Sequence, residues 1–138
     1  MTRVLLAEDN AADVYLIREA LREHHVTCDL RVAADGQEVL EVLKGNKPQV
    51  EGIKLLILDL NLPRHDGIEI LERLRNSGLR NIPIVVLTSS DSQRDRDLAM
   101  KLGAVRFLRK PSELEQFLSL GAVFKELLGE SNAAAESA

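Results

Sequence analysis

The sequence predicts an α/β protein: a single doubly wound domain in which a five-stranded parallel sheet is flanked by five helices. Five short apolar runs alternate along the chain with longer segments whose apolar residues recur at helical spacing. Strands that are apolar on both faces are typical of parallel sheets, because the long crossovers between such strands place helices on both sides. A length of 138 residues suits one domain with its own core.

The apolar runs define the predicted strands. They cover residues 4–7, 30–34, 55–58, 84–87 and 105–108, of which the last is the weakest. The predicted helices fill the intervals and follow the last strand. They begin after Asn10, whose side chain can cap a helix, and after Asp35-Gly36 with an end near Gly45, and then cover about 67–78, 91–102 and 112–128.

Two segments fall outside this alternation. Residues 45–54 form a longer connection than is usual, and we expect an exposed insertion there. Residues 129–138 lack the apolar content for another core, although their alanines are able to prolong the last helix. We therefore expect one domain over residues 1–128, a polar tail over 129–138 and no output domain.

The composition excludes several classes of function. The net charge of −4, from 18 basic and 22 acidic residues, gives no general attraction to nucleic acid. The apolar runs are far shorter than the roughly 20 residues of a membrane-spanning helix. The single cysteine, Cys28, cannot form a disulfide within the chain, and the first residues do not resemble a signal peptide. A cytoplasmic protein that binds neither nucleic acid nor membrane fits best.

Polar residues directly follow four of the five predicted strands. In chain order they are Glu8-Asp9-Asn10, Asp59-Leu60-Asn61, Thr88-Ser89-Ser90 and Lys110-Pro111. In an open parallel sheet, ligands bind beyond the carboxyl ends of the strands, where the strand order reverses. We therefore expect these residues to converge at one edge of the sheet.

The three acids Glu8, Asp9 and Asp59 predict a metal site. Carboxylates held in one pocket repel one another unless a cation lies among them. Oxygen ligands without histidine or thiolate suit Mg²⁺ better than zinc. The alternative is that Asp9 only favours the start of a helix, but this does not account for acids at the ends of two different strands.

The same pocket has the groups that phosphoryl transfer requires. Asp59 ends a rigid apolar strand, and a carboxylate can act as the nucleophile that forms an acyl phosphate. Lys110 and the metal would neutralise the phosphoryl oxygens, while the Thr88 hydroxyl would donate a hydrogen bond. The backbone of Lys110 is restricted because Pro111 follows, and a cis peptide bond is an option there.

Five segments of the sequence resemble the receiver domain of two-component response regulators, over about residues 3–128. They are Leu5-Leu6-Ala7-Glu8-Asp9-Asn10, Leu58-Asp59-Leu60-Asn61-Leu62-Pro63, Asp66-Gly67, Leu87-Thr88-Ser89-Ser90 and Phe107-Leu108-Arg109-Lys110-Pro111. The resemblance implies the flavodoxin-like strand order 2-1-3-4-5, for which a chemotaxis receiver is a known example. The chain looks most like small stand-alone receivers coupled to bacterial phytochromes and related sensor kinases.

The resemblance also assigns roles to residues. Mg²⁺ would be held by Glu8, Asp9, Asp59 and the backbone carbonyl of Asn61, and Asp59 would accept the phosphoryl group from a sensor histidine kinase, of phytochrome type or related, or from a phosphotransfer protein. Thr88 and Lys110 would contact that group, Phe107 would change rotamer as the switch operates, and the Lys110–Pro111 bond would be cis. Such a protein is a phosphoacceptor for signalling rather than a turnover enzyme, with self-phosphorylation from small donors and autodephosphorylation expected.

Three residues depart from the commonest receiver pattern. Glu8 stands where many receivers have aspartate, so its contact with the metal would be indirect. Ser89 replaces a frequent alanine and would slightly crowd the entrance to the site. Phe107 has no hydroxyl group, so the switch would have to work through packing alone.

The last predicted helix has two apolar stripes. Leu114, Phe117, Leu118, Gly121 and Leu128 make one stripe, which we expect to face the core. Leu120, Val123 and Leu127 make a second, which we interpret, together with the fourth helix and the Phe107 strand, as a face for a downstream protein or a second copy of the chain.

Two other functions fit parts of the sequence. A degenerate receiver would bind a partner without being phosphorylated, but the presence of Asp59, Thr88 and Lys110 with the acidic pair disfavours it. A Mg²⁺-dependent phosphotransferase or nucleic-acid enzyme would pair Glu8 with an Asp-x-Asp motif, whose second half Asn61 interrupts.

Overall fold

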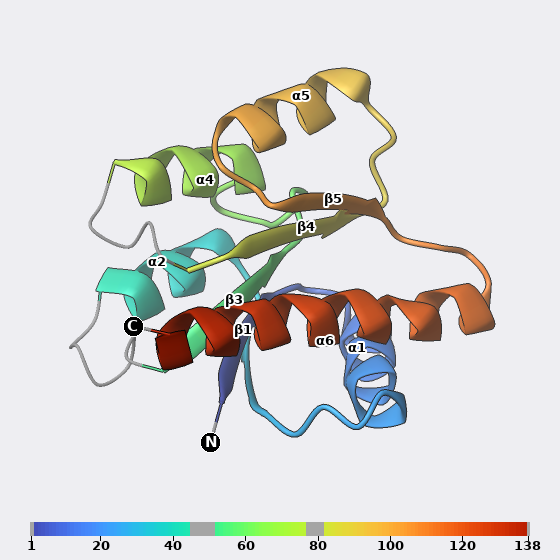
Figure 1. Cartoon of the computed structure of the whole chain (residues 1–138). Coiled ribbons are helices and arrows are strands. Elements are labelled where there is room, and N and C mark those ends of the chain that lie inside the picture. Colours follow the sequence, from blue (N-terminus) through green and yellow to red (C-terminus); the bar gives the residue numbers. More distant parts are fainter. Residues whose placement is uncertain (1, 45–51, 77–81, 138) are drawn as a thin grey trace.

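The computed structural model describes residues 2–44, 52–76 and 82–137. Five parallel strands form one sheet in the order β2-β1-β3-β4-β5 (Figure 1), as the sequence predicts. The strands are β1 (Arg3–Ala7), β2 (Asp29–Ala33), β3 (Ile53–Leu58), β4 (Ile84–Thr88) and β5 (Arg106–Arg109). Because the order reverses between β1 and β3, the carboxyl ends of these two strands border the edge where a ligand is expected.

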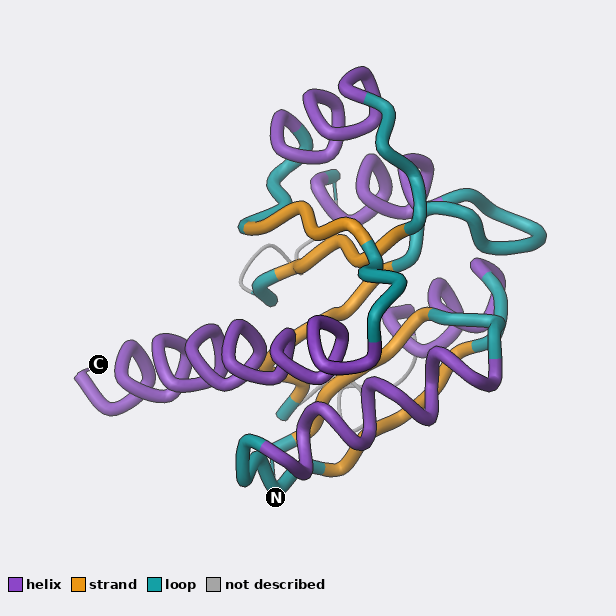
Figure 2. The backbone as a smooth tube through the Cα atoms, turned by 90° about the vertical axis from the view of Figure 1, so that its right-hand side faces the viewer, coloured by secondary structure: helices purple, strands orange, loops and turns teal. Residues whose placement is uncertain are grey.

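Helices cover both faces of the sheet. They are α1 (Ala11–Glu23), α2 (Gly36–Lys44), α4 (Gly67–Arg75), α5 (Gln93–Lys101) and α6 (Leu114–Ser137). Helices α1 and α6 lie side by side on one face, and α2, α4 and α5 lie on the other (Figures 1 and 2). None of the helices in the described residues has both the length and the apolar character to cross a membrane.

Four of these helices begin at a capping side chain in the connection that follows a strand. Asn10 accepts a hydrogen bond from the backbone N–H of Asp13 at 3.0 Å, as the sequence predicts for the first helix. Asp35, Asp66 and Ser92 cap α2, α4 and α5 in the same way. Each cap fixes where its helix starts, so the first turns of α1, α4 and α5 lie close to the carboxyl edge of the sheet.

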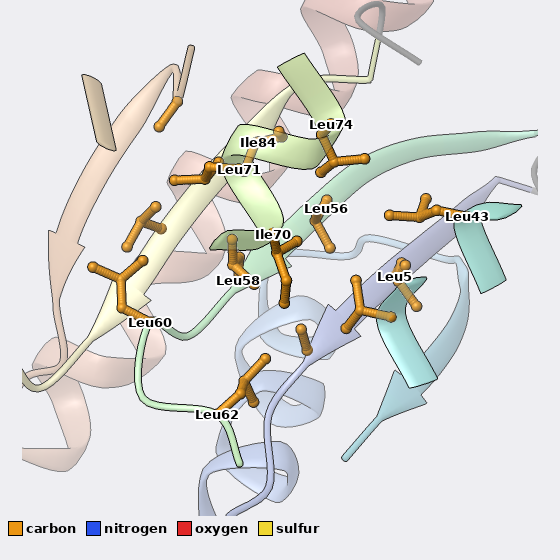
Figure 3. Close-up of a cluster of buried hydrophobic side chains, with 14 of the residues drawn as sticks. Leu5, Leu43, Leu56, Leu58, Leu60, Leu62, Ile70, Leu71, Leu74 and Ile84 are labelled. Atoms are coloured by element: carbon orange, nitrogen blue, oxygen red, sulfur yellow. The ribbon is translucent and has the colours of Figure 1, made fainter. Parts of the chain in front are cut away.

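Apolar side chains from both faces bury the central strands. One cluster packs the sheet against α2, α4 and α5; Figure 3 shows Leu56 and Leu58 of β3 meeting Ile70 and Leu71 of α4. A second cluster packs the opposite face against α1 and α6 and includes the fully buried Phe124. With packing on both sides, β1, β3 and β4 are held rigidly, and so are the residues at their ends.

Several element boundaries differ from the prediction. β3 begins at Ile53, inside the segment expected to be an insertion, and the remainder of that insertion, 45–51, lies outside the described residues. Helix α5 begins two residues later than expected because Ser92 caps it. Helix α6 continues through the alanines to Ser137 instead of ending at 128.

The predicted partner face on the last helix is wrong. Leu120 and Leu127 are buried, with exposed fractions of 8% and 3%, and Val123 packs against the same cluster, whereas Leu114 is 59% exposed. The reason is that α6 packs on the sheet and on α1 together, so it buries a wider apolar surface than contact with the sheet alone would need. The two apolar stripes of α6 therefore belong to one continuous contact with the core, and the second stripe is not a free surface.

Gly121 is where α6 comes closest to α1. A Cβ atom built there would lie 2.2 Å from the backbone carbonyl oxygen of Ala20, so the two helices touch with no room for a side chain. Gly129, on the same helix, is exposed and has open space around the same position.

The two glycines make a matched test of this packing. Gly121→Ala should lower the free energy of unfolding by about 1–3 kcal/mol, because the backbones of α1 and α6 must separate. Gly129→Ala should raise it by roughly 0.5–1 kcal/mol, because alanine is the better helix former. Urea denaturation measures both, and stabilisation by both substitutions would contradict the close contact.

Candidate functional site

Buried polar side chains gather at one edge of the sheet. Among the described residues, those classed as buried and polar or charged are Glu8, Asp59 and Thr88, with exposed fractions of 2%, 5% and 0%. They follow or end β1, β3 and β4, as predicted. Burial of a charged group is costly unless it is paired, so this concentration marks a site with a function other than packing.

The acidic cluster consists of Glu8, Asp9 and Asp59. Each offers a carboxylate oxygen, and these oxygens lie within 4.8 Å of one another. Backbone hydrogen bonds extend the sheet to the cluster: the N–H of Asp59 donates to Ala7 and that of Glu8 donates to Ala33, both at 3.0 Å. The predicted acids are therefore brought together, on rigid backbone.

The charges in the acidic cluster are not balanced. Burial raises the pKa of Glu8, and the neighbouring carboxylate of Asp59 raises it further, while hydrogen bonding and attraction to Lys110 only partly offset these effects. Three acids thus face one ammonium group. A divalent cation among the carboxylate oxygens would relieve the repulsion, and an all-oxygen set is the kind that Mg²⁺ or Mn²⁺ accepts.

Lys110 reaches into the cluster from the end of β5. Its Nζ lies 2.7 Å from Glu8 Oε1, 2.8 Å from Asp13 Oδ2 and 3.0 Å from Asp59 Oδ2. Burial alone would lower the pKa of Lys110, but the hydrogen bonds to the three carboxylates outweigh burial and raise the pKa well above its usual value. The lysine is therefore a permanent positive charge at this edge.

The expected cis bond before Pro111 is absent. No peptide bond in the described residues is cis, so Lys110–Pro111 is trans, and the prediction is wrong. The backbone N–H of Lys110 donates to the carbonyl oxygen of Thr88 at 2.7 Å, which continues the pairing of β5 with β4. With the backbone fixed in this way, the long lysine side chain reaches the carboxylates without a cis bond.

Thr88 and Asn61 lie on the other side of Asp59. The side-chain amide of Asn61 donates to the Thr88 hydroxyl oxygen at 3.4 Å, and the backbone N–H of Ser90 donates to the same oxygen at 3.3 Å. The backbone N–H of Asn61 donates to Asp59 Oδ1 at 3.0 Å, which orients the carboxylate. The second oxygen of Asp59 is the one that Lys110 contacts.

Phe107 connects this edge to the outer helix α5. It is 9% exposed and packs with the cluster that α2, α4 and α5 cover. The guanidinium carbon of Arg96, on α5, lies 5.9 Å from the centre of its ring, within the range of a cation–π contact. Nearby, the Ser90 hydroxyl donates to Asp95 of α5 at 2.9 Å.

Asp13 is a residue of the site that the strand-end pattern does not predict. It lies in the first turn of α1, and its carboxylate is one of the three that hold Lys110. A signal was present: Cα–Cβ bonds in a helix tilt toward its N-terminus, so an acid in the first turn of a helix that starts at the sheet edge points back to that edge.

The family model of the response regulator receiver domain matches residues 4–120. The chain therefore belongs to this family, the phosphoacceptor signalling domains of two-component systems, as the sequence motifs indicated. Response regulator MprA of Mycobacterium ulcerans is 35% identical over 136 residues, which are 98% of this chain and 55% of MprA. The chain spans about half the length of the curated relatives it matches.

Solved structures of similar length also match. One is the phosphorylated cyanobacterial phytochrome response regulator RcpA, with a TM-score of 0.83, 32% identity and coverage of 92% of this chain and 93% of RcpA. Another is the Mn²⁺-bound form of response regulator Rcp1, with a TM-score of 0.81, 29% identity and coverage of 91% and 92%. The predicted receiver fold is thus confirmed.

The charge balance at the cluster makes a stability prediction. In a metal-free solution with chelator, Lys110→Met should lower the free energy of unfolding by about 3 kcal/mol, because it leaves buried carboxylates without a counterion. Lys125→Met, at an exposed position on α6, should change it by less than about 0.5 kcal/mol. Equal effects of the two substitutions in denaturant titrations would show that Lys110 does not balance the cluster.

Proposed function

We propose that this chain receives a phosphoryl group on Asp59 from a sensor histidine kinase or a phosphotransfer protein, with Mg²⁺ bound at the acidic cluster, and signals through contact with a further protein. The observation that carries this proposal is the position of Asp59: it directly follows the buried strand β3, lies beside two other acids, and has the Lys110 Nζ 3.0 Å from one of its oxygens. A receiver that only binds a partner has no need for this arrangement.

The residues around Asp59 divide the work of phosphoryl transfer. A carboxylate oxygen of Asp59 attacks phosphorus, the phosphorus bond to the donor breaks, and the donor group leaves with the electron pair. The backbone N–H of Asn61 fixes the direction of the attacking carboxylate. Lys110 and the Thr88 hydroxyl would donate hydrogen bonds to the phosphoryl oxygens, Lys110 with its full charge.

The proposed ligands of Mg²⁺ are Glu8, Asp9, Asp59 and the backbone carbonyl of Asn61. Three carboxylate oxygens within 4.8 Å of one another fit a hard divalent ion, and the similar protein Rcp1 has been crystallised with Mn²⁺. When bound, such an ion neutralises charge on the phosphoryl oxygens. The glutamate at position 8 is one methylene longer than an aspartate, so its contact with the ion would be indirect.

The route from Asp59 to a partner is proposed to run through Thr88 and Phe107. If the Thr88 hydroxyl turns toward a phosphoryl group, it gives up the hydrogen bonds from Asn61 and Ser90. Val86, two residues before Thr88, pairs in register with Phe107, which packs near Arg96 of α5. The output face then lies on α5 and β5, where a downstream protein or a second copy would bind, and not on the buried stripe of α6.

The kinase partner is proposed to be of the phytochrome type. RcpA is a phytochrome response regulator, and a further similar structure, 25% identical, is the response regulator RPA3017 in red light signalling of R. palustris. Both match about nine-tenths of this chain.

Labelling with a small donor tests the acceptor. Acetyl phosphate with Mg²⁺ should add one phosphoryl group to the wild type, and Asp59→Asn should add none, because the amide cannot act as the nucleophile. Intact mass spectrometry measures the product. Asp97→Asn, on the exposed face of α5, is the matched control and should label like the wild type; equal labelling of Asp59→Asn would place the acceptor elsewhere.

Thermal unfolding tests the metal site. Mg²⁺ at ten times its dissociation constant should stabilise the wild type by about 1.4 kcal/mol, because it binds only the folded state. Asp9→Ala removes one exposed ligand without disturbing the core and should respond much less, while Asp97→Ala should respond fully. A melting temperature of the wild type that does not change with millimolar Mg²⁺ would refute the site.

A further inference from the structure

The ammonium group of Lys110 has three protons and three carboxylate partners. Glu8 and Asp59 are two of them, and the third is Asp13, which comes from α1 and lies 2.8 Å from Nζ. Lysine has three N–H donors and no acceptor, so every donor is used. Nothing in the proposed chemistry of the acidic cluster requires Asp13, yet its contact is as short as the others.

Asp13 differs from the other two partners in its surroundings. Glu8 and Asp59 belong to the acidic cluster, whereas Asp13 does not. It lies in the first turn of α1, where the positive end of the helix dipole favours a negative charge. Its backbone N–H donates to Asn10 Oδ1 at 3.0 Å, so the residue that presents the carboxylate is fixed by the helix cap.

The other two contacts cannot persist unchanged during phosphorylation. Under the proposed function, on which this inference rests, Glu8 and Asp59 turn toward the metal, and Asp59 becomes bonded to phosphorus. A lysine with a long flexible stem would then lose two of its three anchors at the step where its direction matters most. Asp13 is the partner of Lys110 that would bind neither the metal nor the phosphoryl group.

We propose that Asp13 is a positioning residue for phosphoryl transfer. It holds the Lys110 ammonium at the mouth of the site while Glu8 and Asp59 exchange partners, so that the two remaining N–H donors point to the phosphoryl oxygens. Because Asp13 acts on the lysine and not on the metal, its loss slows labelling without weakening Mg²⁺ binding.

The test is a time course of labelling by acetyl phosphate, followed by intact mass at several Mg²⁺ concentrations. Asp13→Ala should label about tenfold more slowly at saturating Mg²⁺, with the Mg²⁺ concentration for half-maximal rate changed by less than about twofold. Asp13→Glu, which retains the charge, should recover part of the rate. Glu115→Ala removes an exposed acid from the first turn of α6 and should label like the wild type.

A second background shows whether Asp13 acts through Lys110. In Lys110→Met, the further change Asp13→Ala should have less than about a twofold effect on the rate, because there is no ammonium left to position. Equal slowing in both backgrounds would overturn the proposal, and so would an unchanged or faster rate in Asp13→Ala alone. If Asp13→Ala unfolds, as circular dichroism would reveal, the isosteric Asp13→Asn replaces it with the same criteria.

The two proposals fail in different ways. A wild type that gains no phosphoryl mass would overturn the proposed function and this inference together. A wild type that labels on Asp59, combined with an Asp13→Asn or Asp13→Ala variant that labels at the wild-type rate, would overturn this inference and leave the proposed function standing.

Discussion

The contact between the Lys110 ammonium and the carboxylates of Glu8 and Asp59 is the interaction on which the site depends. The Lys110 side chain extends from the end of β5 to the ends of β1 and β3. It therefore links β5 to two strands that are not its neighbours in the sheet. It also leaves the site short of positive charge, since several acids share a single lysine. The site is therefore assembled but not electrostatically satisfied, which is the condition under which binding a cation or transferring charge is favourable.

The sequence was sufficient for the fold because its local signals agreed with one another. The strands are apolar on both faces, caps such as Asn10 stand at helix starts, and the polar residues follow strand ends, so topology alone brings Glu8, Asp59 and Thr88 together. The family motifs then supplied strand order. None of this required knowledge of side-chain conformation, since the positions of strand ends follow from the backbone.

The errors concern contacts that depend on how elements pack. A helical wheel shows that the stripe containing Leu120 and Leu127 is apolar, but it does not show that a second helix covers this stripe. The cis bond at Lys110 was inferred from a resemblance, and side-chain length made it unnecessary. Asp13 was missed because its partner is 97 residues away, and periodicity carries no information about such a pair.

The close approach of Gly121 to Ala20 has a mechanical consequence. Because there is no space between the two backbones, α1 packs tightly against α6. The part of the site next to the first turn of α1 is therefore rigid. Helix α5, on the opposite face of the sheet, is packed more loosely. All of its residues are described, and Ala99 is the only one of them that is buried. If phosphorylation of Asp59 displaces a helix, we expect the loosely packed α5 to move rather than α1.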